Sequence, residues 1–341
     1  MQIQQKLEIL TRLGEYIKSN DEKWKEVKEL ASRMNYWFIP QFIDNAVEAI
    51  ATQYLTKEIL LSFIASYELD VNDDIDQSKK LGIVMAGNIP LVGFHDFMMG
   101  FLAGYELNLK LSSKDEVLIK HLIEKMIEWE PSLSERIYIQ KMLQGCDLYI
   151  ATGSNNTAQT FAYYFGKYPN LIRHNRTSIA VLTGKESDDE LKALVNDIYQ
   201  YFGLGCRNVS KIYVPEGYNF ERLIQKINKY ALPNDHNQYL NNYDYQLALV
   251  MLNGVPYMSA HHIVLTESTS EFGPVATLHY EFYQDLNQVE KALELSKDSL
   301  QVVLSHADIK NALPFGSSQK PGISDFADGE DTFEFLLQHS T

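Results

Sequence analysis

Residues 81–90 read LGIVMAGNIP, and this stretch decides the expected fold. Its first six residues are apolar, which is typical of a short buried strand. The strand would end at Gly87 and Asn88, residues that favour a turn, and Pro90 suits the first turn of a helix. Residues 92–103 continue as an apolar helix. The stretch therefore predicts a strand, a corner and a helix in succession.

The same alternation extends over most of the chain. Further strands are expected at residues 107–111, 147–151, 178–182, 211–215, 248–252, 262–265, 300–304 and 332–337. Helices are expected between most of these runs, and residues 1–68 show helical spacing of their apolar side chains. Strands that alternate with helices are typical of a parallel sheet with crossover connections. The predicted fold class is therefore α/β, with a helical N-terminal segment.

Composition excludes several classes of protein. Of the 341 residues, 45% are hydrophobic and 22% are charged, which is an ordinary globular composition with room for two domains. The sequence has 45 Asp and Glu and 30 Lys and Arg, which gives a formal charge of -15. This excess of acidic residues argues against a nucleic-acid-binding protein. The sequence contains no apolar run fit to span a bilayer and no signal peptide, so a cytoplasmic protein without a membrane span is expected.

Two cysteines are present, Cys146 and Cys206. They are too few for a disulfide framework, and no Cys or His spacing typical of zinc occurs, so no metal site is predicted. Cys206 lies in GLGCRN, residues 203–208, where glycines leave room for a substrate and Arg207 can lower the thiol pKa. The alternative is a small buried cysteine in a loop, and Cys146 is interpreted in that structural sense.

Polar residues follow three of the expected strands. They are Asn88 after the first, Lys110, Ser112 and Ser113 after the second, and Gly153 and Ser154 after the third. The Asn88 amide can donate to an oxyanion, or simply serve the turn. The second group can hold an adenosine ribose or its 2′-phosphate, or form a solvated loop. The third can hold phosphate or a nicotinamide ribose, or cap the next helix. The common glycine motifs for dinucleotides and phosphates are absent.

In this order the motifs resemble the aldehyde dehydrogenase superfamily and, within it, the LuxC-like acyl-CoA reductases. The resemblance runs from about Leu81 to the C-terminus. Residues 87–90 resemble the Asn-x-Pro corner that helps form the oxyanion hole, 110–113 the segment at the adenosine ribose, 152–154 the turn beside the cofactor phosphates, 203–206 the nucleophile loop, 271–274 the Glu-x-Phe-Gly-Pro segment and 313–316 the late Pro-Phe-Gly turn. The resemblance implies that Glu271 and Phe272 contact the cofactor, although this match is one residue out of register and Ser270 is an alternative to Glu271.

The resemblance also implies a domain organisation. Residues 1–182 would form a Rossmann-type cofactor domain that includes a helical N-terminal segment, residues 1–70. Residues 183–325 would form an α/β catalytic domain carrying the thiol of Cys206. Residues 326–341 would contain an oligomerisation strand, so a homo-oligomer is expected.

Two departures from the family pattern sharpen the expected activity. Hydrolytic members carry a Glu that activates water, and by spacing that position falls near Ile172, where no acid is found. Ser113 replaces the ribose-binding Glu, which favours NADPH over NADH. The resemblance then implies NADPH-dependent reduction of an acyl-CoA thioester, or of an acyl-carrier substrate, to an aldehyde of fatty type, with Cys206 as nucleophile and CoA as co-product. An oxidative NAD(P)-dependent aldehyde dehydrogenase and an acyl-transfer subunit without reductase activity remain alternatives.

Overall fold

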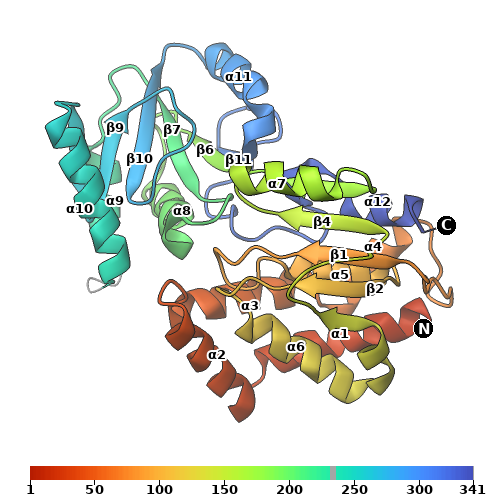
Figure 1. The fold of residues 1–341 in the computed structure, drawn as a ribbon. Coiled ribbons are helices and arrows are strands. Elements are labelled where there is room, and N and C mark those ends of the chain that lie inside the picture. The colour runs from red at the N-terminus through yellow and green to blue at the C-terminus, as the bar shows by residue number, and fades with distance from the viewer. Residues whose placement is uncertain (231–235, 341) are drawn as a thin grey trace. The chain divides into compact units, whose positions relative to one another are not determined.

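The computed structural model describes residues 1–230 and 236–340, which divide into two units. The first unit comprises residues 1–175 together with the chain from Pro321 onward, and the second comprises Arg176–Lys320 (Figure 1). The expected boundary after residue 182 lies too late. The strand that ends at Val181 is hydrogen-bonded within the sheet of the second unit and therefore belongs there.

Four helices form the N-terminal segment, as predicted. They are α1 (Ile3–Lys18), α2 (Glu22–Met34), α3 (Pro40–Gln53) and α4 (Lys57–Ala65). The apolar stripe of α1, which includes Leu7, Leu10 and Leu13, is buried in the core of the first unit. Asp21 and Thr56 cap the N-termini of α2 and α4 with their side chains. α1 packs against α3 and α4, and α1 and α2 also contact later helices of the same unit.

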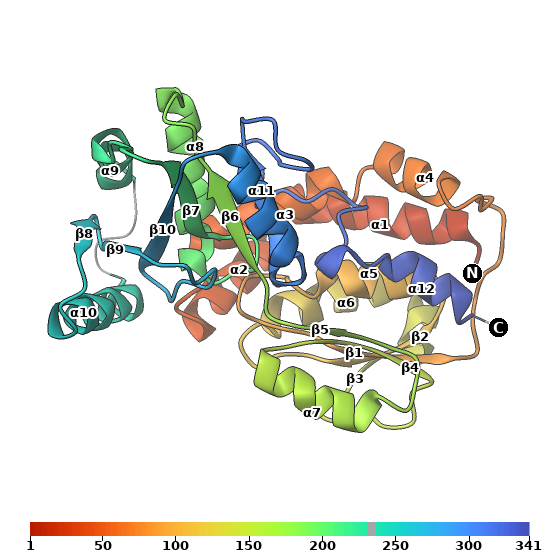
Figure 2. The same ribbon diagram turned by 90° about the horizontal axis from the view of Figure 1, so that it is seen from above.

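The sheet of the first unit has five parallel strands in the order β3-β2-β1-β4-β5. They are β1 (Lys80–Val84), β2 (Glu106–Lys110), β3 (Ile137–Ile139), β4 (Leu148–Thr152) and β5 (Asn170–Arg173). Helices α5 (Phe94–Leu102) and α6 (Val117–Trp129) lie on one face, and α7 (Asn155–Phe165) lies on the other (Figure 2). This strand order, with helices on both faces, is the doubly wound arrangement.

The sheet of the second unit has six strands in the order β11-β6-β7-β10-β9-β8, and β8 alone runs antiparallel to its neighbour. They are β6 (Thr177–Val181), β7 (Val209–Pro215), β8 (Tyr257–Ala260), β9 (Ile263–Glu267), β10 (Thr277–Tyr283) and β11 (Leu300–Ser305). Its helices are α8 (Asp188–Tyr199), α9 (Glu221–Asn228), α10 (Asn237–Leu252) and α11 (Leu286–Leu295). The α/β fold class with parallel sheets is confirmed.

Two predicted strands are wrong. Residues 248–252 are the end of α10, which begins at Asn237. An apolar run of five residues does not distinguish the end of a long helix from a short strand. Residues 332–337 lie in α12 (Thr332–Gln338), where Asp331 caps the helix and Phe333 and Leu336, three residues apart, are both fully buried. The terminal segment therefore packs into its own unit as a helix, and the predicted oligomerisation strand is absent from residues 326–340.

Candidate active site

The corner after β1 presents Asn88 at the surface, while Gly87 beneath it is buried. A Cβ on Gly87 would lie 2.5 Å from the Ser112 Oγ and 2.6 Å from the Ser112 Cβ, so only glycine permits this contact. The segment that follows β2 therefore packs directly against the Asn88 corner. Two groups of residues that the sequence analysis singled out separately are thus brought together in space.

Asp115 binds the same corner and was not among the residues predicted from the sequence. Its Oδ2 accepts a hydrogen bond of 2.6 Å from the backbone N–H of Leu91, whose φ of 56° is unusual for a non-glycine residue. The carboxyl group is buried, and burial raises its pKa to about 7. The only signal in the sequence was an acidic residue just before an apolar helix, which is ordinary helix-start chemistry.

The remaining predicted residues of the first unit lie at the same edge of the sheet. Lys110 is the exposed last residue of β2, and Ser113 is exposed three residues later. Gly153 follows β4, and the exposed Ser154 is the N-cap residue of α7, with its Oγ 2.9 Å from the Oγ1 of Thr157. Because β2, β1 and β4 are adjacent and parallel, all these segments leave the sheet at its carboxyl edge.

This edge is where doubly wound sheets bind ligands. The strand order changes direction between β1 and β4, so the corner of Asn88 and the turn of Gly153 and Ser154 flank the switch point. The N-terminal N–H groups of α7 add a site favourable for an anion. Exposed polar side chains, the turn at Gly153 and the N-terminus of α7 are features that suit the phosphates of a dinucleotide.

Cys206 is exposed in the turn before β7, as its predicted role requires. Its backbone carbonyl accepts a 3.0 Å hydrogen bond from the Ser178 Oγ on β6. The chain enters the turn through Tyr201, Phe202 and Gly203, which all have positive φ, at 55°, 56° and 73°. The two aromatic side chains are buried, and this packing holds a backbone conformation that is unfavourable for them.

Asn208 ties the thiol turn to the end of α8, and the sequence analysis missed this role. Its Nδ2 donates to the carbonyl oxygens of Asp197 (3.0 Å) and Gln200 (2.6 Å), and its Oδ1 accepts from the backbone N–H of Gly205 (2.9 Å). The side chain is buried. Its position two residues after Cys206 was the available signal, but only the fold shows that its partners lie upstream of the thiol.

Asp197 anchors the late Pro-Phe-Gly turn to the same helix. Its buried carboxylate accepts hydrogen bonds from the Gly316 N–H (2.5 Å) and the Ser318 hydroxyl (2.7 Å), while burial raises its pKa to about 6. Arg207 donates to the Ser318 carbonyl at 3.4 Å. Residues 316–318 are therefore connected both to α8 and to the thiol loop.

Glu271 and Phe272 lie on the loop between β9 and β10, in the same unit as Cys206. The Glu271 carbonyl accepts a 2.7 Å hydrogen bond from the Ser210 Oγ, four residues after the cysteine. The Glu271 carboxylate accepts a hydrogen bond from Ser296. Phe272 is 37% exposed. Cys206, Glu271 and Phe272 therefore gather at the amino edge of the second sheet, ahead of β7 and β10.

Ile172, the position at which the resemblance would place a water-activating Glu, lies on β5. The neighbouring charged residue, Arg173, is held in an ion pair. Arg173 binds both carboxylate oxygens of Asp96 on α5, at 2.5 and 2.6 Å, and donates to the Thr332 hydroxyl on α12 at 2.7 Å. The pair is buried. Arg173 and Asp96 therefore join three elements of the first unit, and neither offers a free base for activating water.

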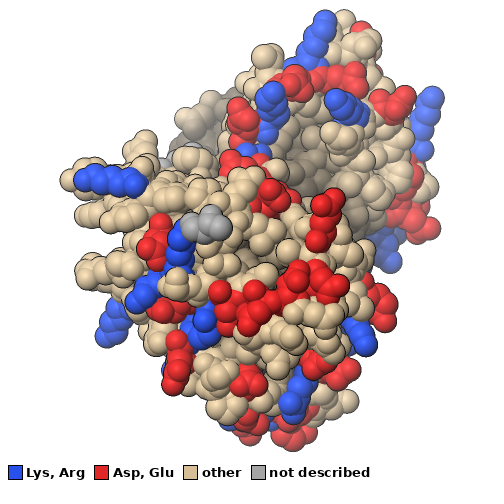
Figure 3. Space-filling view, turned by 90° about the vertical axis from the view of Figure 1, so that its right-hand side faces the viewer, with Lys and Arg blue, Asp and Glu red and all other residues tan. Residues whose placement is uncertain are grey.

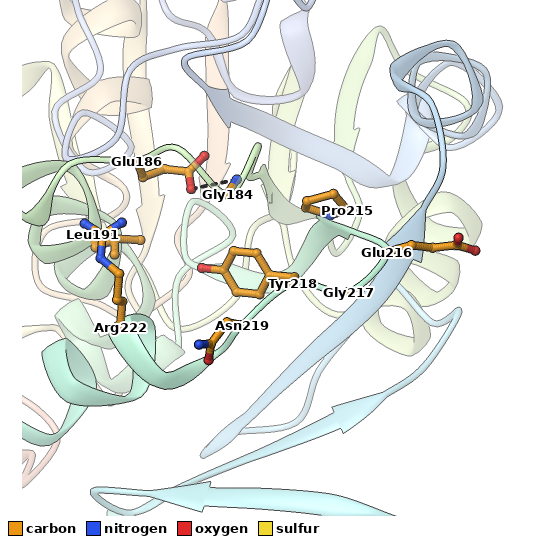
Figure 4. A pocket seen from close by; sticks show the side chains of 9 residues that line it. All are labelled: Gly184, Glu186, Leu191, Pro215, Glu216, Gly217, Tyr218, Asn219 and Arg222. Carbon is orange, nitrogen blue, oxygen red and sulfur yellow. Dashed lines mark hydrogen bonds between the residues drawn. The ribbon is translucent and has the colours of Figure 1, made fainter.

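Figure 4 shows the lining of a cavity of about 240 Å³. Pro215, the last residue of β7, lines it, whereas Cys206 precedes the first residue of that strand. Loops after β6 and β7 form it, with Gly184, Pro215 and Tyr218 in its wall. The Glu186 carboxylate in this wall is already bound to the backbone N–H groups of Thr183 and Gly184. None of the predicted site residues lines this cavity.

The surface agrees with the acidic composition. On the face drawn in Figure 3, acidic side chains gather in places and basic ones are interspersed among them. No helix of the described residues combines the length and apolarity needed to cross a membrane.

Comparisons with solved structures identify the fold. The chain is similar to aldehyde dehydrogenase 21 from Physcomitrella patens in complex with succinate, with a TM-score of 0.69, 12% identity and coverage of 100% of this chain and 85% of that one. It is also similar to lactaldehyde dehydrogenase from Escherichia coli (TM-score 0.68, 14% identity, 91% and 75% coverage) and to an indole-3-acetaldehyde dehydrogenase in complex with NAD⁺ (0.67, 12%, 92% and 74%). No protein-family model and no curated protein matches the sequence. The aldehyde-dehydrogenase-like fold predicted from the motifs is confirmed, and at these identities the likeness concerns the fold alone.

Proposed function

We propose that the chain is a nicotinamide-dependent oxidoreductase that reduces an acyl-CoA thioester to an aldehyde through a thioester on Cys206. One observation carries the proposal. An exposed cysteine sits in a turn held by Asn208 and Ser178, within an aldehyde-dehydrogenase-like fold, and no carboxylate occupies the position near Ile172. A thioacyl enzyme without a base for water favours exchange with a thiol over hydrolysis.

A nicotinamide dinucleotide fits the carboxyl edge of the first sheet. Lys110, Ser112 and Ser113 would hold the adenosine ribose, and Gly153 and Ser154 would face the phosphates. Glu271 and Phe272 are proposed, on the resemblance, to contact the cofactor as well. The absence of a carboxylate at Ser113 favours NADPH, because a 2′-phosphate would meet a hydroxyl and the nearby Lys110. The cofactor, when bound, supplies the hydride.

The residues of the chain perform the acyl chemistry. The Cys206 thiolate attacks the acyl carbonyl carbon, and the bond from that carbon to the CoA sulfur breaks, so CoA departs as a thiolate that takes a proton from solvent. On the resemblance, stabilisation of the oxyanion is assigned to the amide of Asn88 and the backbone N–H of Cys206, at roughly 3 kcal/mol per donor. The thiohemiacetal that reduction leaves on Cys206 then gives its hydroxyl proton to solvent, its carbon–sulfur bond breaks, and the aldehyde departs, which restores the Cys206 thiolate.

An oxidative aldehyde dehydrogenase is the second candidate. It is supported by the fold, since similar structures are aldehyde dehydrogenases and one of them binds NAD⁺. Incubation with an aldehyde and NADP⁺, with and without CoA, separates the two candidates. Turnover to a carboxylic acid that ignores CoA would favour the oxidative enzyme, whereas dependence on CoA favours the acyl-CoA reductase.

A panel of acyl-CoAs of increasing chain length tests the proposal directly. NADPH and NADH oxidation and intact-protein mass spectrometry would report reduction and the acyl adduct. Cys206→Ala should lose both, whereas Cys146→Ala, which alters a buried thiol, should retain both. Aldehyde formation by Cys206→Ala would overturn the mechanism. Acylation without any binding of NADPH or NADH would instead indicate an acyl-transfer subunit.

A further inference from the structure

Two segments that have different roles in the proposed function meet in one buried contact, which Gly87, Ser112 and Asp115 form; it is called the joint below. Residues 110–113 are assigned to the cofactor and Asn88 to the oxyanion. Gly87 has no room for a Cβ because Ser112 lies 2.5 Å from where it would be, and the Asp115 Cβ lies 3.3 Å from the same point. The backbone N–H of Met85 also donates to the Lys110 carbonyl at 3.0 Å. The two segments therefore cannot move independently.

Asp115 is the side chain that crosses this joint. Its backbone N–H donates to the Ser112 carbonyl at 3.0 Å, which fixes it to the cofactor segment. Its Oδ2 accepts from the Leu91 N–H at 2.6 Å, which fixes it to the far end of the Asn88 corner. Asp115 is 7% exposed, and its Oδ1 has no hydrogen-bond partner among the described residues. A buried carboxyl with an unsatisfied oxygen is unfavourable for stability.

We propose that Asp115 is a positioning residue that couples the cofactor segment at residues 110–113 to the oxyanion donor Asn88. This inference rests on the proposed function. A ligand that orders Ser112 and its neighbours restricts Asp115 through the backbone. Asp115 in turn holds Leu91 in its positive-φ conformation, and with it the corner that aims Asn88. Cofactor binding then fixes the position of the Asn88 amide before hydride transfer. This role explains why a buried carboxyl that lowers stability is present at position 115.

The test is a double-mutant cycle on single-turnover acylation of Cys206 by acyl-CoA, measured by mass spectrometry with and without NADP⁺. NADP⁺ cannot donate hydride, so the adduct accumulates. In the wild type, NADP⁺ should accelerate acylation several-fold. Asp115→Ala should lower the rate roughly tenfold and remove the acceleration. In an Asn88→Ala background the same change should have little further effect, because Asp115 acts through Asn88.

Asp115→Asn serves as the conservative variant, since its amide oxygen can still accept the Leu91 N–H, and it should restore most of the rate. Gly87→Ala places a methyl group against Ser112 and should also abolish the acceleration of acylation by NADP⁺. This variant tests the proposal if Asp115→Ala does not fold. Additive effects of Asp115→Ala and Asn88→Ala, or unchanged acceleration by NADP⁺ in Asp115→Ala and Gly87→Ala, would overturn the coupling. A wild type that no acyl-CoA acylates would instead refute the proposed function.

Discussion

At the scale of single residues, the candidate site depends on buried amide and carboxyl groups that do not react. Asn208 fixes the turn of Cys206 by using both halves of its amide, and Asp197 fixes the neighbouring turn at Gly316. Such side chains can hold a candidate nucleophile such as Cys206 within the small displacements that a reaction tolerates. Their contribution can be measured separately from that of the thiol.

Asn208→Ala should weaken both the fold and the acylation of Cys206. Removing the amide takes one hydrogen-bond donor from each of the Gln200 and Asp197 carbonyls, which should lower the free energy of unfolding by about 2 kcal/mol. Acylation should fall further than stability predicts, because the Gly205 N–H loses its acceptor and the thiol turn loosens. Urea denaturation and adduct kinetics measure the two effects. Asn253→Ala, at an exposed asparagine, is the matched control, and equal behaviour of the two variants would contradict this role.

The raised pKa of Asp115 predicts a specific dependence of stability on pH. Burial raises this pKa from 3.8 to about 7, so between these values the folded state holds a proton that the unfolded state has released. The stability contributed by Asp115 is therefore complete below pH 3.8 and is lost as the pH rises through about 7, by at most about 4 kcal/mol.

Asp115→Asn removes this titration. The free energy of unfolding of the variant should therefore increase relative to that of the wild type from pH 4.5 to pH 7.5 in urea denaturation series. The exposed Asp189→Asn should show no such trend over that interval. A constant difference between Asp115→Asn and the wild type would show that Asp115 ionises normally in the folded protein.

At the scale of elements, the terminal helix α12 completes the first unit. The Thr332 hydroxyl at its start accepts from Arg173 at the end of β5, and Arg173 also binds Asp96 on α5. Phe333 and Leu336 are buried in the same core as the N-terminal helices. A strand at this place would expose one of these two side chains, because residues three apart point to opposite faces of a strand.

Arg173→Met should destabilise the first unit strongly. It leaves the buried Asp96 carboxylate without its partner, and the expected loss is about 3–5 kcal/mol in the free energy of unfolding. The double variant Arg173→Met with Asp96→Leu should recover much of this loss, because no buried charge remains. Thermal and urea denaturation measure both, with the exposed Arg33→Met as control. If Arg173→Met alone were as stable as the wild type, the ion pair would not contribute to the free energy of unfolding.

At the scale of the whole molecule, the first sheet gathers its polar segments at one edge. The corner of Asn88, the segment from Lys110 and the turn of Ser154 are far apart in sequence but follow the adjacent strands β1, β2 and β4. Parallel order forces their carboxyl ends to the same side. A dinucleotide bound there should therefore protect all three segments at once.

Hydrogen–deuterium exchange with and without NADPH should show this pattern. Backbone amides of residues 86–93, 110–116 and 153–158 should exchange more slowly when NADPH is bound, because the ligand suppresses local opening of the loops it contacts. Segments at the amino edge of the same sheet, residues 77–80 and 104–107, are the internal control and should change little. Protection confined to the control segments would place the cofactor elsewhere.

Much of this protein follows from sequence alone. Apolar runs ended by turn residues located β1, β2, β4, β6 and β7, because a buried parallel strand leaves a local pattern. The order of the motifs predicted the fold, and Cys206, which that order singled out as the reactive thiol, is exposed. Short apolar runs at residues 248–252 and 332–337 misled the assignment, because periodicity cannot separate a strand from a helical turn over so few residues.

Only the tertiary structure determined what holds the reactive groups in place. Asn208, Asp115 and Asp197 have partners that lie 8 or more residues away in sequence, and no local pattern marks such contacts. The contact of Gly87 with Ser112 likewise arises from the pairing of β1 with β2. Local sequence thus determined which residues carry the candidate chemistry, because strands and turns form from neighbouring residues. The fold determined which buried side chains hold those residues in place, because burial and hydrogen bonding join segments that are distant in sequence.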